Sequence, residues 1–215
     1  NFKDAEYNER LAIELNPKDE IAHSNLSNTL SNIGQIDEAE FFARKAIQIN
    51  PRYEGGHNNL ATILRDVGRT KEAEISINES IKLKPNHAKS YSQLAGILID
   101  LGKIKEAEIA LMKSLKIDPN NSQAIFIYST FKKSKEEEFY KNILFSKNIL
   151  ENKSKKECID IYFARANILH LEKKYKESAK NLVLGNELKR TITITDTDEL
   201  IKKFFFLLNQ SNEET

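Results

Sequence analysis

Two asparagines, Asn25 and Asn59, stand 34 residues apart in the similar segments AHSNL and GHNNL, and Gln93 follows at the same spacing. A carboxamide carries a hydrogen-bond donor and an acceptor, so it can bind both the N–H and the C=O of an extended peptide. Each such bond contributes only about 1 kcal/mol net, so a useful affinity needs several together. The spacing predicts a row of amides that holds a peptide by its main chain. The alternative is a solvated polar face in a chain that is rich in asparagine throughout.

Residues for catalysis or metal binding do not form comparable patterns. His23 and His57 share the 34-residue spacing, but Tyr91 replaces them in the next copy and no acidic or cysteine partner lies at ligand spacing. We therefore interpret both histidines as structural. The single Cys158 excludes an internal disulfide and most zinc sites. The sequence contains no nucleophile elbow, phosphate loop, catalytic carboxylate pair or dinucleotide-binding glycine cluster. We expect no catalysis by this chain, no cofactor and no metal.

Composition limits the class of partner. The 215 residues are 40% hydrophobic and 30% charged, which is typical of a folded chain, and the net charge of +1 gives no electrostatic reason to expect nucleic acid or an anionic membrane as a partner. The longest apolar run, residues 204–208, is too short to cross a membrane. The chain opens on NFKDAEYNER without an initiator methionine or a signal peptide, which suggests a fragment. We expect a cytoplasmic location.

The helices that must position the amides are predicted from a single 34-residue sequence period. Pro17, Pro51, Pro85 and Pro119 are each 34 residues apart, and GQIDEAE, GRTKEAE and GKIKEAE recur between them. Glycine tolerates the positive φ that ends many helices, and proline cannot continue a helix. Each period therefore predicts two helices, with a glycine after the first and a proline after the second. Few glycines and prolines over 215 residues favour an all-α fold.

This pattern resembles the tetratricopeptide repeat, most specifically over residues 20–121. The resemblance implies a right-handed superhelix (an α-α solenoid) of antiparallel helix hairpins, with the first helices lining a concave groove. The expected organisation is a truncated repeat at 1–19, repeats at 20–53, 54–87 and 88–121, a degenerate hairpin at 122–156, a divergent repeat at 157–190, a capping helix at 191–209 and a tail or linker at 210–215. In the degenerate hairpin, the second helix is expected to be the longer one.

The same resemblance implies which side chains face the groove. On the 34-residue spacing, we expect peptide binding by Ser24, Asn25, Asn28, Asn32, Asn58, Asn59, Arg65, Lys89, Ser92 and Gln93. AHSNL and GHNNL are similar to the asparagine ladder of the O-linked N-acetylglucosamine transferase family, in which such asparagines hold a peptide backbone. The carboxylate clamp of chaperone-binding repeats is a poorer match. Two of its three cations are absent, since Ser24 and Gln93 stand where lysine and arginine are expected.

Three functions remain open from the sequence. The first is a non-catalytic scaffold that binds a protein or peptide in the groove. The second is the recruiting arm of a larger enzyme, because residues 162–208 resemble the segment before the sulfotransferase domain of marine cyanobacterial repeat proteins. That catalytic domain would lie beyond Thr215. The third is a spacer that associates end to end with other copies, since unpaired solenoid ends tend to stack.

Overall fold

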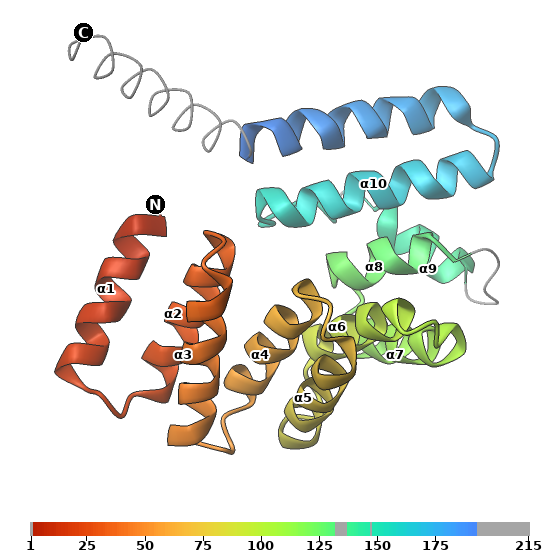
Figure 1. Ribbon diagram of the computed structural model, residues 1–215. Coiled ribbons are helices and arrows are strands. Elements are labelled where there is room, and N and C mark those ends of the chain that lie inside the picture. Colours follow the sequence, from red (N-terminus) through yellow and green to blue (C-terminus); the bar gives the residue numbers. More distant parts are fainter. Residues whose placement is uncertain (1, 132–136, 147, 193–215) are drawn as a thin grey trace, which may run out of the picture. The chain divides into compact units, whose positions relative to one another are not determined.

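The computed structural model describes residues 2–131, 137–146 and 148–192, and divides the chain into two compact units, residues 1–121 and 122–215 (Figure 1). In these ranges every regular element is a helix, as expected from the sequence. The first unit contains α1 (Phe2–Leu15), α2 (Glu20–Asn32), α3 (Ile36–Ile49), α4 (Glu54–Asp66), α5 (Thr70–Leu83), α6 (Ala88–Asp100) and α7 (Ile104–Ile117). The second contains α8 (Ser122–Ser129), α9 (Glu137–Leu144), α10 (Lys155–Leu171) and a helix over residues 175–192.

The turns inside the hairpins of the first unit repeat one geometry. Gly34, Gly68 and Gly102 have φ of +82°, +78° and +74°, which confirms the predicted left-handed helix ends. The residue after each glycine donates its N–H to a carbonyl five residues earlier, as in Arg69 N–H to Leu64 O at 2.8 Å. This bond closes the last turn of the helix as a Schellman motif. The repeated glycine therefore fixes the angle at which each second helix returns.

The core of the first unit lies between the two helices of each hairpin. Leu26 and Leu30 of α2 are fully buried, and they belong to the same cluster as the fully buried Ala39 and Ala43 of α3. Small side chains on the second helix let its backbone approach the leucines of the first closely. The next hairpin repeats the arrangement, with Leu60 and Leu64 of α4 meeting Ala73 and Ile77 of α5. The helix pairing expected from the period is thus produced by leucines facing alanines.

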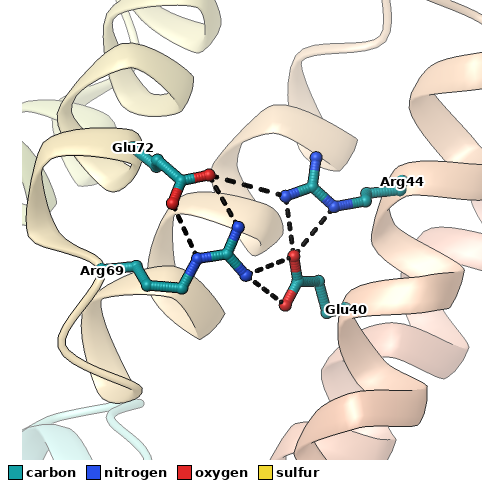
Figure 2. A network of polar contacts seen from close by, with 4 residues as sticks. All are labelled: Glu40, Arg44, Arg69 and Glu72. Carbon is teal, nitrogen blue, oxygen red and sulfur yellow. Dashed lines mark hydrogen bonds and ion pairs between the residues drawn. The ribbon is translucent and has the colours of Figure 1, made fainter.

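Charged side chains join successive second helices. Arg69, just before α5, donates to both carboxylate oxygens of Glu40 on α3 at 2.8 and 2.9 Å and to Glu72 at 2.6 and 2.7 Å. Arg44 completes this cluster by donating to Glu40 at 2.7 and 2.8 Å (Figure 2). Burial alone would raise the pKa of Glu40, but the hydrogen bonds from Arg44 and Arg69 lower it below its usual value. The glutamates come from the repeated EAE segments, and Lys103 with Glu74 repeats the Arg69–Glu40 pair one hairpin later.

The second unit is built from α8, α9, α10 and the helix over residues 175–192. α8 and α9 both contact α10, and Gly185 lies against the Phe163 ring of α10 so closely that a Cβ would come within 2.8 Å of it. Arg165 of α10 donates to Leu144 O at 2.9 Å and Ser146 O at 3.3 Å, which satisfies carbonyls at the end of α9. As described, α8 and α9 have eight residues each, and residues 132–136 before α9 lie outside the described part, so a longer second helix in this hairpin stays a prediction.

The capping helix expected at 191–209 lies outside the described residues from position 193 on, as does the tail expected at 210–215. Within the described ranges, no helix combines the length and apolar character that crossing a membrane requires.

Candidate functional site

The candidate groove is formed by the first helices of the hairpins. α2 contacts α4, and α4 contacts α6, so these three helices form one continuous row. Each is covered on one side by its own second helix, α3, α5 or α7. The side chains of the row that do not pack against these partners are the ones available to a ligand.

Four predicted site residues are exposed on this row: Asn25, Asn28 and Asn32 on α2, and Lys89 on α6. The Asn32 side chain donates to Asn28 O at 2.8 Å, one turn earlier on the same helix. The carboxamides of Asn25 and Asn28 make no hydrogen bond to the described part of the chain, so both keep a donor and an acceptor free. Peptide binding by these four residues stays a prediction.

Asn59 uses its carboxamide inside the protein. Its Nδ2 donates to Ser24 O at 2.9 Å and to Ser24 Oγ at 3.0 Å, and this joins α4 to α2. Ser24 is buried and also accepts from the Ser27 hydroxyl at 2.7 Å. The expectation that the amide hydrogens of Asn59 are free for a peptide is therefore wrong, as is the expectation that Ser24 is accessible. The two residues form a joint between neighbouring hairpins.

Gln93 forms the corresponding joint between α6 and α4. Its Nε2 donates to Thr62 Oγ1 at 2.7 Å, and its Oε1 is buried with no hydrogen-bond partner among the described residues. Arg65 adds an ion pair to Asp100, with Nε 2.5 Å from Oδ2. The guanidinium of Arg65 lies over Gly96, where a Cβ would meet Nη1 at 2.6 Å. Arg65 and Gln93 are both partly exposed, and the Arg65 guanidinium is already paired with a carboxylate.

Asn58 and Ser92, which were also expected at the groove, are buried instead. Asn58 is 5% exposed, and its Nδ2 donates to Ser90 Oγ at 3.0 Å. Ser92 donates to Lys89 O at 2.9 Å. The prediction that these side chains face the groove is wrong, because both are buried and Asn58 bonds the neighbouring helix α6 while Ser92 bonds the backbone of its own helix.

A buried polar cluster surrounds Ser90, which sequence reasoning did not single out. Its Oγ lies 3.0 Å from Asn58 Nδ2, 3.3 Å from Ser80 Oγ and 2.9 Å from His87 Nδ1. Burial lowers the pKa of His87, and the nearby Lys84 lowers it further. The only signal in the sequence is that Ser90 falls at the position of Ala22 and Gly56, where a hydroxyl is unexpected.

Two family models match the segments that carry these joints. Both describe the tetratricopeptide repeat, one over residues 55–87 and 88–121 and the other over residues 10–41. These segments are tetratricopeptide repeats. None of the curated proteins matches the chain.

Solved structures show the same fold. MamA, known from a crystal structure, is 14% identical, with 89% of this chain and 91% of that one covered and a TM-score of 0.52. YrrB, described as a TPR protein with an unusual peptide-binding site, is 16% identical, with 84% and 91% covered and a TM-score of 0.53. At these identities the likeness establishes a TPR solenoid fold for the chain.

The repeat histidines have a structural partner. His23 Nε2 lies 3.1 Å from Pro17 O, and His57 Nε2 lies 3.0 Å from Pro51 O, so each ties its first helix to the turn before it. His23 also stacks on the Phe42 ring at 5.7 Å. Among the described residues, no group of three or more His, Cys, Asp or Glu side chains is placed to hold a metal ion. The exposed polar surface of α2 and α6 is therefore the candidate functional site.

Proposed function

We propose that this chain is a non-catalytic scaffold whose TPR groove holds an extended segment of a protein or peptide. The observation that carries the proposal is the pair of exposed carboxamides at Asn25 and Asn28, which have no hydrogen bond within the described chain. They lie three residues apart on α2, so they share one helix face. Two amides on one face can match alternate N–H and C=O groups of a peptide backbone.

Rigidity of the groove favours binding. The Asn59–Ser24 bonds join α2 to α4, and the Gln93–Thr62 bond joins α4 to α6. A row fixed in this way loses little conformational freedom when a ligand binds, so most of the ordering cost falls on the peptide. The carboxamides of Asn59 and Gln93, which join the helices, thus support binding by the exposed carboxamides of Asn25 and Asn28.

The charges near the groove favour a ligand that is not strongly acidic or basic. Lys89 and Asp66 are exposed on α6 and α4, and Arg65 is neutralised by Asp100. Single charges of both signs provide orientation more than affinity. The fold itself suits the role, since YrrB is described as having a peptide-binding site. Such repeats generally bind partners rather than catalyse reactions.

The proposal is tested by selecting peptide ligands and then comparing their affinity for a groove variant and for a control variant. Twelve-residue peptides selected from a displayed library against the whole chain would be titrated by fluorescence anisotropy. Asn25→Ala with Asn28→Ala should weaken binding by about 30-fold, because two hydrogen bonds of about 1 kcal/mol each are lost. Asn8→Ala with Asn78→Ala, on exposed positions of α1 and α5, is the control and should leave the affinity unchanged.

Main-chain recognition has a second signature. Methylating alternate backbone nitrogens of the selected peptide should abolish binding, whereas alanine substitution of most of its side chains should have little effect. Equal affinity of the parent and of the Asn25→Ala, Asn28→Ala variant would overturn the role of these residues.

A more specific alternative function uses the same groove. In this alternative, the repeats recruit a substrate or partner for a sulfotransferase domain beyond residue 215, and the chain acts in the cytoplasm. The resemblance of residues 162–208 is its support. Sequencing the reading frame downstream of Thr215 tests it, because a phosphosulfate-binding domain would have to follow.

A further inference from the structure

The outer face of the repeats carries a regular row of exposed apolar side chains. Tyr7, Phe41, Ile75 and Ile109 are 34 residues apart, one on each second helix, and are 68%, 61%, 72% and 67% exposed. We call these four residues the outer stripe. Single apolar residues on a surface are ordinary, but the same position is apolar and exposed on all four second helices of the first unit. The next position in the repeat varies freely, as Asn8, Phe42, Ser76 and Ala110.

The stripe lies away from the candidate groove. The groove is formed by α2, α4 and α6, whereas the stripe is carried by α1, α3, α5 and α7. Phe41 and Ile75 project from the sides of α3 and α5 opposite the buried Ala43 and Ile77, which pack inward. The outer stripe is therefore available while the groove is occupied.

Charges of both signs flank the centre of the stripe. One helical turn before Phe41 and Ile75 stand Asp37 and Lys71, both exposed, and one turn after them stand Lys45 and Glu79. Neighbours four residues apart share a helix face, so each apolar residue has a charge above and below it. The signs are opposite on the two helices: acidic then basic on α3, and basic then acidic on α5.

This pattern is complementary to itself. A twofold axis parallel to α3 and α5 and midway between them would place α3 of one copy on α5 of another. Phe41 would then meet Ile75 of the second copy, Asp37 would meet Lys71, and Lys45 would meet Glu79. Isologous contacts of this kind use one patch twice. The net charge of +1 leaves little long-range repulsion between two copies.

A shallow hollow lies at the proposed axis. It has a volume of about 400 Å³ and is bounded by Ile47 on α3 and Ile75 on α5, with Leu60 of α4 also lining it. Because Ile75 forms one wall, the Phe41 ring of a second copy placed over Ile75 could enter the hollow. The aromatic ring is the largest apolar group of the stripe and would exclude water from it.

We propose that the outer stripe at α3 and α5 is a homodimer interface, occupied by the same face of a second copy of this chain. Each 14-residue helix is about 20 Å long. A contact confined to two such helices is smaller than the roughly 800 Å² per partner of a standard stable interface, so we expect a weak, transient dimer.

Sedimentation velocity of the whole chain from about 1 to 300 µM tests the proposal, with a reductant present because Cys158 could otherwise link two copies. The parent should shift from monomer to dimer. Phe41→Asp with Ile75→Asp should weaken dimerisation at least tenfold, and Ile21→Lys, at an exposed position where the third repeat has Lys89, should behave like the parent. Circular dichroism would confirm that each variant is folded.

Charge reversal tests whether the proposed twofold axis pairs Asp37 of one copy with Lys71 of the other. Asp37→Lys or Lys71→Glu alone should weaken the dimer, and the two together should restore it, because the opposite charges meet again with their signs exchanged. A parent that stays monomeric throughout the range would overturn the proposal. A dimer that survives Phe41→Asp with Ile75→Asp would overturn it as well, and growth beyond the dimer in that variant would indicate end-to-end stacking instead.

Discussion

Replacing Asn59 by alanine should destabilise the protein, although the sequence suggested that this residue serves a ligand. The change removes two contacts from Nδ2, to Ser24 O at 2.9 Å and Ser24 Oγ at 3.0 Å, and leaves the buried Ser24 hydroxyl without that donor. A neutral hydrogen bond contributes about 1 kcal/mol net, and a buried group left unpaired costs about as much again. We expect Asn59→Ala to reduce the free energy of unfolding by about 1–2 kcal/mol.

Asn25 provides the matched comparison, because it stands 34 residues earlier and is exposed. Asn25→Ala should change the free energy of unfolding by less than about 0.5 kcal/mol. Urea unfolding followed by helical circular dichroism would measure both, and hydrogen exchange would show whether Asn59→Ala loosens α2 and α4 before the rest. Equal effects of the two substitutions would refute the assignment of Asn59 to the joint between repeats.

Four other predictions concern single residues. Lys173 has a φ of 62° at the place where the other repeats have glycine, so Lys173→Gly should raise the free energy of unfolding by about 1 kcal/mol in urea titrations. Burial raises the pKa of Asp160 to about 6, with Lys156 and the Ser122 hydroxyl opposing it. The folded state therefore binds the Asp160 proton more tightly than the unfolded state, and stability is lost as the pH rises from about 4 to 6. At pH 8, Asp160→Asn should stabilise the chain by about 1–2 kcal/mol, a value reduced for its partial exposure to solvent. Burial lowers the pKa of His87 in the folded state, so the stability that depends on the neutral ring is lost as the pH falls below about 6.5, and His87→Asn should flatten that part of the pH profile in thermal melts. Arg165→Ala should leave the carbonyls at the end of α9 unpaired and cost about 2 kcal/mol, which hydrogen exchange in residues 141–146 would localise.

The turns were predictable because one residue type decides each of them. Gly34, Gly68 and Gly102 were expected to have a positive φ, and they do, because a left-handed residue ending a helix strongly favours glycine. In the divergent repeat Lys173 occupies the place of the turn glycine, and it takes the same conformation with φ of 62°. Backbone geometry that depends on local sterics can thus be inferred from spacing alone.

The amides could not be assigned in the same way. Asn25, Asn58 and Asn59 have the same side chain, yet Asn25 is exposed, Asn58 bonds Ser90 and Asn59 bonds Ser24. Asn25 and Asn59 are equivalent positions, but Asn59 of α4 has the first helix α2 beside it as an acceptor, whereas the described chain has no first helix before α2 that could accept from Asn25. The residue type alone does not show which carboxamide has such a neighbour, so the predicted row of amides included Asn59, which bonds within the protein.

The ion pairs between second helices were missed although their signal was present. Arg69 and Lys103 each follow a turn glycine, and Glu40 and Glu74 each end an EAE segment. The structure pairs Arg69 with Glu40 and Lys103 with Glu74, both 29 residues apart. Comparing charges at equivalent repeat positions would have found the pairs, because a contact between neighbouring repeats must recur at a nearly constant separation.

The most direct test of the central claim is to map where a bound peptide lies. Backbone amide chemical shifts of the isotope-labelled chain would be followed while the peptide selected in the binding assay is added. If the groove binds the peptide, the largest changes occur on α2 around Asn25 and Asn28 and extend to Lys89 on α6, with the outer stripe unaffected. Changes centred on Phe41 and Ile75, with α2 unperturbed, would contradict binding in the groove.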